Sequence, residues 1–239
     1  MRRFVAVLLA FATAVVLGCA TPAPASAPPQ APDGMGGIGI RVDVGAMLGQ
    51  TISAETVFFA RLDAPSGAPE ATRLYASNFR RDGRVYLLGV PPGRYAAVAA
   101  LRSELVLTTK DSRLAYFPQS LIDLTEVSII PGAVAYAGSH VIGIGMPGVC
   151  ASDSDAAQLR HAEMLGPGVP KCGLMRIVLH DLATSPLMVV NGSVFTLGDK
   201  VYHHRASLRE SNRQAADQDE FIARARQDLA ATGWTIGTR

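Results

Sequence analysis

Thiols and imidazoles are the side chains of this sequence best suited to chemistry, and they are few. The chain of 239 residues contains three cysteines and five histidines. A thiol can be acylated, oxidised to a disulfide or deprotonated to bind a metal, and an imidazole can bind a metal or transfer a proton. Spacing, and the elements that carry these side chains, decide which of these chemistries applies.

The cysteines fall into a single residue and a pair. Cys19 ends an apolar N-terminal run, which leaves Cys150 and Cys172. In an exported protein such a pair predicts a disulfide, worth roughly 3 kcal/mol through restriction of the unfolded chain. Two free, buried thiols are the alternative. A zinc site is disfavoured because no CxxC motif accompanies the pair.

The histidines give weak metal candidates. His203 and His204 are adjacent, and neighbouring side chains on a strand point to opposite faces, so both would rarely reach one ion. His180 lies upstream, and the H-x-x-x-H spacing of a zinc helix is absent. We therefore predict no metal site, with His180, His203 and His204 as the weak candidates.

Catalytic and cofactor motifs are similarly incomplete. Ser139-His140 lacks the G-x-S-x-G motif of a nucleophile elbow. Gly143, Gly145 and Gly148 match G-x-G-x-x-G, but too little chain follows for a dinucleotide-binding sheet. No catalytic residue and no cofactor are predicted. An enzyme site in the loops after Gly145, using His161, His180 or His203, remains an alternative.

The N-terminal run itself is informative. Arg2 and Arg3 precede the uncharged segment 4–17, which is shorter than the roughly 20 residues of a spanning helix. It ends Val16-Leu17-Gly18-Cys19, which resembles the lipobox of bacterial lipoproteins. The resemblance implies lipidation of Cys19, cleavage of residues 1–18, and, with Ala20 next, an outer-membrane location facing the periplasm. The inner membrane or the cell surface, and a secretory leader cut after residue 25 or 27, are the alternatives.

Composition fits such an arrangement. Residues 20–33 contain five prolines, which favours an extended tether of up to about 43 Å at 3.1 Å per residue. Without Arg2 and Arg3 the chain has 20 basic and 20 acidic side chains, which disfavours nucleic-acid binding. We expect the membrane as a partner, through the lipid, with an envelope protein as a candidate second partner.

Strand signals dominate residues 36–149. Residues 38–44 alternate between apolar and polar. Arg80-Arg81-Asp82-Gly83 separates strand-like runs at 74–79 and 84–90, which predicts a hairpin with a positive φ at Gly83. The segment Leu88-Gly-Val-Pro-Pro-Gly-Arg-Tyr95 resembles the strand connection of transthyretin-like, carboxypeptidase-regulatory-like domains. The resemblance implies an antiparallel, Ig-like β-sandwich, and the predicted class is mainly β.

The remaining residues, 150–239, predict a C-terminal α+β extension packed on the sandwich and ending in one or two helices. Residues 152–155 offer a helix cap, and Asn191-Gly192 predicts a hairpin. Ser207-x-x-Glu210 and Asp217-x-x-Glu220 look like capping boxes, and an apolar stripe follows the second. Together with the tether at 19–35, the expectation is a non-catalytic envelope lipoprotein with a structural or protein-binding domain. A small-ligand or metal carrier with a site after Gly145 is a further alternative.

Overall fold

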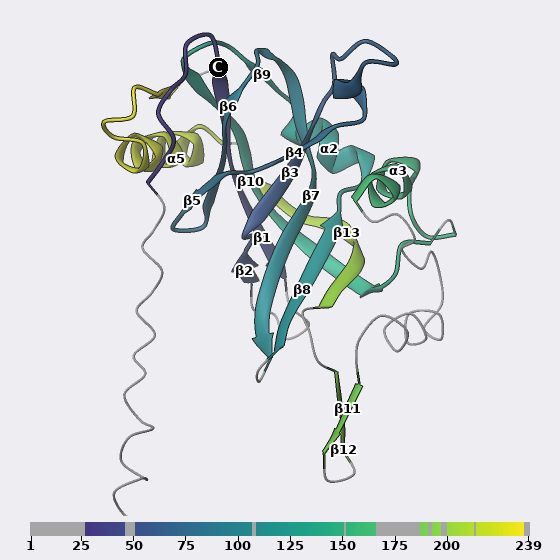
Figure 1. Cartoon of the computed structure of the whole chain (residues 1–239). Helices are drawn as coiled ribbons and strands as arrows, with labels where there is room; N and C mark the ends of the chain where they lie inside the picture. Colours follow the sequence, from purple (N-terminus) through teal and green to yellow (C-terminus); the bar gives the residue numbers. More distant parts are fainter. Residues whose placement is uncertain are drawn as a thin grey trace, which may run out of the picture.

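A computed structural model describes residues 27–45, 51–106, 109–150, 152–165, 187–190, 193–196, 200–212 and 214–236. The fold is mainly β with helices toward the C-terminus, which confirms the predicted class (Figure 1). Among the described helices, none combines the length and the apolar character that crossing a membrane requires.

Twelve strands form one sheet, and two more form a separate hairpin. The strands of the large sheet are β1 (Gly36–Gly45), β2 (Thr51–Ser53), β3 (Thr56–Arg61), β4 (Leu74–Ala76), β5 (Phe79–Arg81), β6 (Arg84–Val90), β7 (Gly93–Val106), β8 (Thr109–Tyr116), β9 (Val127–Ile129), β10 (Ala133–Pro147), β13 (Lys200–Asn212) and β14 (Thr235–Ile236). The hairpin consists of β11 (Leu187–Val190) and β12 (Ser193–Thr196). The helices are η1 (Pro69–Ala71), α2 (Gln119–Thr125), α3 (Ala156–Leu165) and α5 (Ala215–Asp228).

The sheet is mixed. Its main order is β4-β3-β7-β8-β13-β10-β1-β6-β5, and most neighbours are antiparallel. The pairs β1–β10, β8–β13 and β10–β14 are parallel, so antiparallel pairing does not extend through the whole sheet. β13 lies between β8 and β10, and residues on both sides of the expected boundary at 149 therefore share one sheet.

A two-residue link joins the two ends of this strand order. β4 and β5 are the terminal strands, and only Ser77 and Asn78 separate them. The Ser77 N–H donates to the carbonyl of Val57 on β3, while the Asn78 amide both donates to the Leu88 carbonyl and accepts from the Leu88 N–H. The Asn78 side chain therefore replaces a peptide unit at the sheet edge, which satisfies groups that an open edge exposes.

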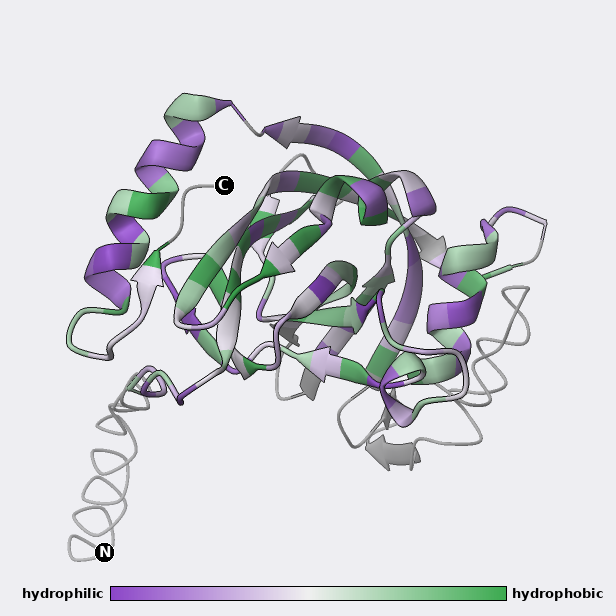
Figure 2. Ribbon diagram, turned by 90° about the horizontal axis from the view of Figure 1, so that it is seen from above, coloured by the Kyte–Doolittle hydropathy of each residue, from purple (hydrophilic) through white to green (hydrophobic). Residues whose placement is uncertain are grey.

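The core follows the alternation seen in the sequence. Ile38, Ile40, Val42 and Val44 of β1 are all buried in the main cluster with apolar residues of β3, β6 and β7. The opposite face of β6 and β10 packs against α5, and α3 covers part of β7 and β8. Seen from above, the sheet curves around this apolar interior, with α5 and α3 on opposite sides (Figure 2).

Several local predictions are confirmed. Asp82 and Gly83 have φ of 46° and 77°, the left-handed pair of a type I′ turn between β5 and β6. β11 and β12 pair antiparallel on either side of residues 191–192, which lie outside the described residues.

Both expected C-terminal capping boxes are wrong. Ser207 and Glu210 lie within β13, because pairing with β8 and β10 on both sides outweighs a local capping preference. α5 begins at Ala215 after Gln214, which makes no side-chain cap, so Asp217 lies in the first turn rather than at the cap. Part of the expected tether contacts the domain, since the Trp234 indole N–H donates to the Pro29 carbonyl at 2.9 Å.

Candidate functional site

A pocket of about 520 Å³ lies beside Gly145, where β13 passes α2 and α3. Its lining is mixed in polarity and includes both charge signs. The lining residues are Pro118, Ser120, Gly145, Asp153, Asp155, Gln158, Arg205, Ala206, Ser207 and Leu208.

The start of α3 fixes one wall of this pocket. Asp155 accepts the Gln158 backbone N–H at 2.8 Å, and the Gln158 side chain accepts the Asp155 N–H at 3.2 Å. This reciprocal pair is a capping box, and it confirms the predicted cap. The second oxygen of Asp155 accepts the Gln119 N–H at 2.7 Å, which ties α3 to the start of α2.

Gln158 also joins the helix to the sheet. Its amide is buried and donates to the carbonyls of Tyr116 on β8 and Ala206 on β13, at 3.0 and 2.9 Å. With its oxygen occupied by Asp155, the buried amide is satisfied by the protein itself. The pocket wall is therefore preorganised by hydrogen bonds from three elements.

Charge enters the pocket through Arg205 and Asp153. The Arg205 guanidinium donates to the Asp153 carbonyl and lies 3.5 Å from its carboxylate. The two side chains are 33% and 53% exposed, so water screens this pair and competes for it. A ligand that carries an amine or a carboxylate can exchange with one partner of such a pair at low cost.

Gly145 is one of the lining residues, and there is open space around it. A Cβ atom placed on this residue would have no atom within 4 Å, apart from those of its chain neighbours. The Gly145 carbonyl points elsewhere, since it accepts the Nδ1–H of His204 at 3.0 Å. A larger side chain at position 145 would therefore meet no neighbouring atom at its Cβ.

The adjacent histidines His203 and His204 bond to different partners, as expected for neighbouring residues on a strand. His203 shares a hydrogen bond of 2.7 Å with the hydroxyl of Tyr116, and the two rings stack. His204 is buried, and burial lowers its pKa, as does the nearby Arg113 to a lesser degree. Burial raises the pKa of the Tyr116 hydroxyl.

The other described histidines lie in separate surroundings. His140 hydrogen bonds to the Ala137 carbonyl through Nε2 and to the Ser211 hydroxyl through Nδ1, both at 3.0 Å. His161 on α3 is only 3% exposed, and burial, followed by repulsion from Arg160, lowers its pKa to about 4. A buried imidazole of this kind is neutral near pH 7.

None of these histidines lines the pocket beside Gly145. Within the described part of the chain, no group of three or more His, Cys, Asp or Glu side chains could hold a metal ion. Cys19, Cys172 and His180 lie outside the described residues, so lipidation of Cys19 and pairing of Cys150 with Cys172 stay predictions.

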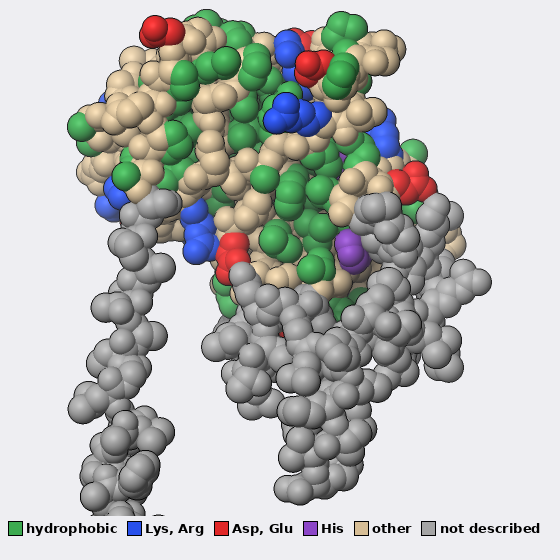
Figure 3. Space-filling model, in the orientation of Figure 1, with side chains coloured by type: hydrophobic (Ala, Val, Ile, Leu, Met, Phe, Trp, Pro, Cys, Tyr) green, Lys and Arg blue, Asp and Glu red, His purple; other side chains and the backbone are tan. Residues whose placement is uncertain are grey.

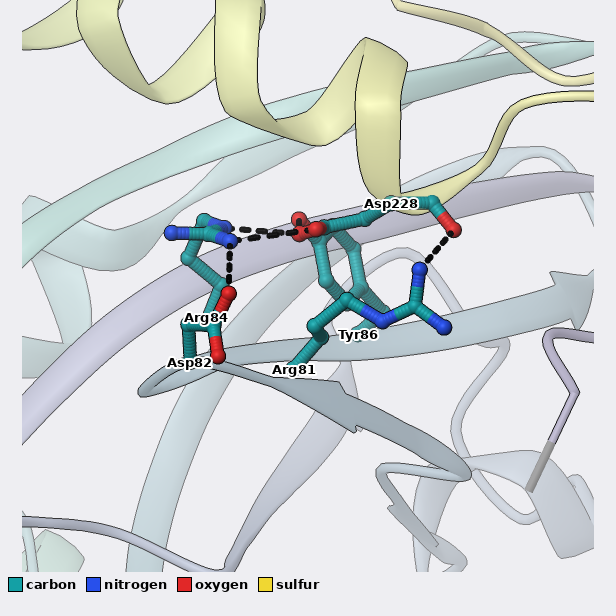
Figure 4. A network of polar contacts seen from close by, with 5 residues as sticks. All are labelled: Arg81, Asp82, Arg84, Tyr86 and Asp228. Carbon is teal, nitrogen blue, oxygen red and sulfur yellow. Dashed lines mark hydrogen bonds and ion pairs between the residues drawn. The ribbon is translucent and has the colours of Figure 1, made fainter. Parts of the chain in front are cut away.

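The most strongly bound polar cluster lies on the other side of the sheet and went unpredicted. Asp228 at the end of α5 accepts Nε and Nη2 of Arg84 at 2.7 and 3.0 Å, and the Tyr86 hydroxyl at 2.6 Å (Figure 4). Arg81 donates to its carbonyl at 3.4 Å. The charged partner of Asp228 therefore lies on β6, 144 residues earlier in the chain.

The shifted pKa values in this cluster are consistent with a charged contact that holds α5 against β6. The hydrogen bond to Asp228 raises the pKa of Arg84, and burial raises the pKa of Tyr86, reinforced by the same carboxylate. Asp228 is 4% exposed, and its carboxylate is occupied by the two side chains of β6. The cluster holds α5 to the sheet and leaves no accessible reactive group at Asp228.

Comparison with protein-family models, with curated proteins and with solved structures gave no match.

Proposed function

We propose that this protein is a cell-envelope lipoprotein, anchored by lipid at Cys19, with a non-catalytic, mainly β domain on the periplasmic side of the outer membrane. The observation that carries the proposal is the sequence Val16-Leu17-Gly18-Cys19 at the end of a basic, then apolar leader. Its role is structural, or it binds another envelope protein.

The domain suits such a role. Proline-rich sequence connects Cys19 to the first fixed contact at Pro29, so the folded part follows the anchor after a short spacer. Acidic and basic side chains are interspersed on the face shown in Figure 3, in keeping with the balanced charge after the leader. Attachment therefore depends on acyl chains rather than on a basic surface.

Metabolic labelling with palmitate in a bacterial host tests the anchor. The full chain should incorporate label, and Cys19→Ala should lose it. The matched control is the double variant Cys150→Ala and Cys172→Ala, which keeps Cys19 and should remain labelled. Label that persists in Cys19→Ala would refute lipidation at this position.

The pocket beside Gly145 favours a second function, the carriage of a small polar ligand. Arg205, Asp153 and two serine hydroxyls present groups of both charge signs and neutral polarity within about 520 Å³. A thermal-shift screen with small amines, carboxylates and polyols tests it, because a ligand that binds the native state raises the melting temperature.

Gly145→Val is the discriminating variant in that screen. Gly145 lines the pocket, and a Cβ there would meet no atom within 4 Å, so added bulk should weaken ligand binding and reduce the shift without lowering the melting temperature of the free protein. An equal shift in Gly145→Val, or no shift with any compound class, would exclude the pocket as the ligand site.

A further inference from the structure

The last part of the expected tether is fixed to one side of the folded domain. Besides the bond from Trp234 to Pro29, the Ala31 N–H donates to the Thr232 carbonyl at 2.9 Å. Further along, the Gly132 N–H donates to the Met35 carbonyl at 2.7 Å. The chain therefore joins the domain next to α5 and β14, as the dark purple segment in Figure 1 shows.

These contacts shorten the spacer. Ten residue steps separate Cys19 from Pro29, and ten steps span at most about 36 Å in a fully extended chain. In polyproline geometry the same span is about 31 Å. A lipid at Cys19 therefore pulls on the domain at Pro29, on the side where α5 and β14 lie.

The pocket lies away from this attachment. α5 is on one side of the curved sheet, and α3, whose first turn lines the pocket, is on the opposite side in both views (Figures 1 and 2). The exposed side chains of α5 carry both signs, with Asp219 and Glu220 beside Arg224 and Arg226. Charge on α5 therefore neither repels nor strongly binds an anionic membrane, and the tether sets the orientation.

We infer that the α5 and β14 side faces the lipid surface, and that the α3 side with its pocket faces away from the membrane. This orientation rests on the proposed lipid anchor. In this orientation a lipid surface lies next to α5. The pocket stays accessible to soluble or envelope partners.

Energy transfer in vesicles tests the orientation. The lipidated full chain is reconstituted into phospholipid vesicles that carry an acceptor dye on a minor fraction of headgroups. Two exposed arginines provide matched labelling positions, as Arg224→Cys on α5 and Arg160→Cys on α3. Each carries a thiol-reactive donor dye, and the parent chain, treated in the same way, gives the background from its own cysteines.

We expect transfer from position 224 to exceed transfer from position 160 by about twofold or more, because a short spacer holds α5 near the acceptors. Lengthening the spacer with a Gly/Ser segment after Ala20 should remove the difference. Equal transfer, or stronger transfer from position 160, in chains that float with the vesicles would overturn the orientation and leave the anchor intact. A lipid-processed chain that fails to float would overturn both.

Discussion

Removal of the Asp228 carboxylate should detach α5 from the sheet. Asp228→Ala deletes the acceptor of three hydrogen bonds and leaves Arg84 and Tyr86 without their shared partner. Tyr86 is fully buried, whereas the Arg84 side chain is 13% exposed and can recover some hydration. Breaking a buried ion pair on one side costs about 3–5 kcal/mol, and the partial access of Arg84 places this case near 3 kcal/mol.

The assay can separate local from global loss. Trp234 is the single tryptophan and packs in the same apolar cluster as Phe221 and Ala225 of α5 and Leu229 directly after it. Its fluorescence therefore reports docking of α5, while far-ultraviolet circular dichroism reports the sheet. At a slope of about 2 kcal/mol per molar urea, the fluorescence midpoint of Asp228→Ala should fall by about 1.5 M.

Asp219→Ala is the control, because Asp219 lies on the same helix with an exposed side chain. Its effect should stay within about 0.5 kcal/mol. Asp228→Asn keeps an oxygen acceptor and should fall between the two variants. If Asp228→Ala unfolds at the same urea concentration as Asp219→Ala, the cluster does not hold α5 and the reasoning is wrong.

Three further predictions follow from individual side chains. The free energy of unfolding should decrease as the pH falls from about 6.5 to 4, because the pKa of His161 is near 6.5 in the unfolded chain and about 4 in the native state. The full loss is about 3 kcal/mol and is reached below pH 4. Urea titrations of the parent chain and of His161→Gln at several pH values measure it. Gly36→Ala should lower the free energy of unfolding by about 2–3 kcal/mol, since its Cβ would lie 2.3 Å from a side-chain carbon of Ile129 and 2.5 Å from the backbone oxygen of Ile130. A Cβ at position 145 would have no atom within 4 Å, so Gly145→Ala should unfold like the parent chain. The purified, oxidised chain should gain two hydrogens in mass on reduction if Cys150 and Cys172 are paired, and an unchanged mass would favour two free thiols.

Local features were predictable where neighbours in sequence supply the cause. The alternation at residues 38–44 produced a strand with one buried face, and Asp82-Gly83 produced the tight turn its φ values require. The stripe of Phe221, Ile222 and Ala225 buried one face of α5. In each case a period of the side chains, or a backbone conformation open to few residues, fixes the outcome within a short segment.

Long-range features were decided by the tertiary structure. α2 went unpredicted because it is only seven residues long and has no side-chain cap; the buried Thr125 at its end instead bonds to the backbone of Ala97 on β7. Likewise, the pocket beside Gly145 combines residues 118–120, 145, 153–158 and 205–208, and no spacing in the sequence predicts their meeting.

The sequence alone therefore determined the mainly β character and the amphipathic last helix, and it contains the Cys19 motif on which the lipoprotein proposal rests. Tertiary structure decided that residues 200–212 join the centre of the sheet, that Asp228 bonds to Arg84, and that residues 29–31 contact the segment after α5. The physical reason is that these outcomes depend on pairing between groups far apart in the chain. β8 and β13 pair across more than 80 residues, Arg84 and Asp228 are 144 residues apart, and Pro29 and Trp234 are 205 residues apart. Local preference is worth tenths of a kcal/mol per residue, and a paired strand or a buried ion pair outweighs it.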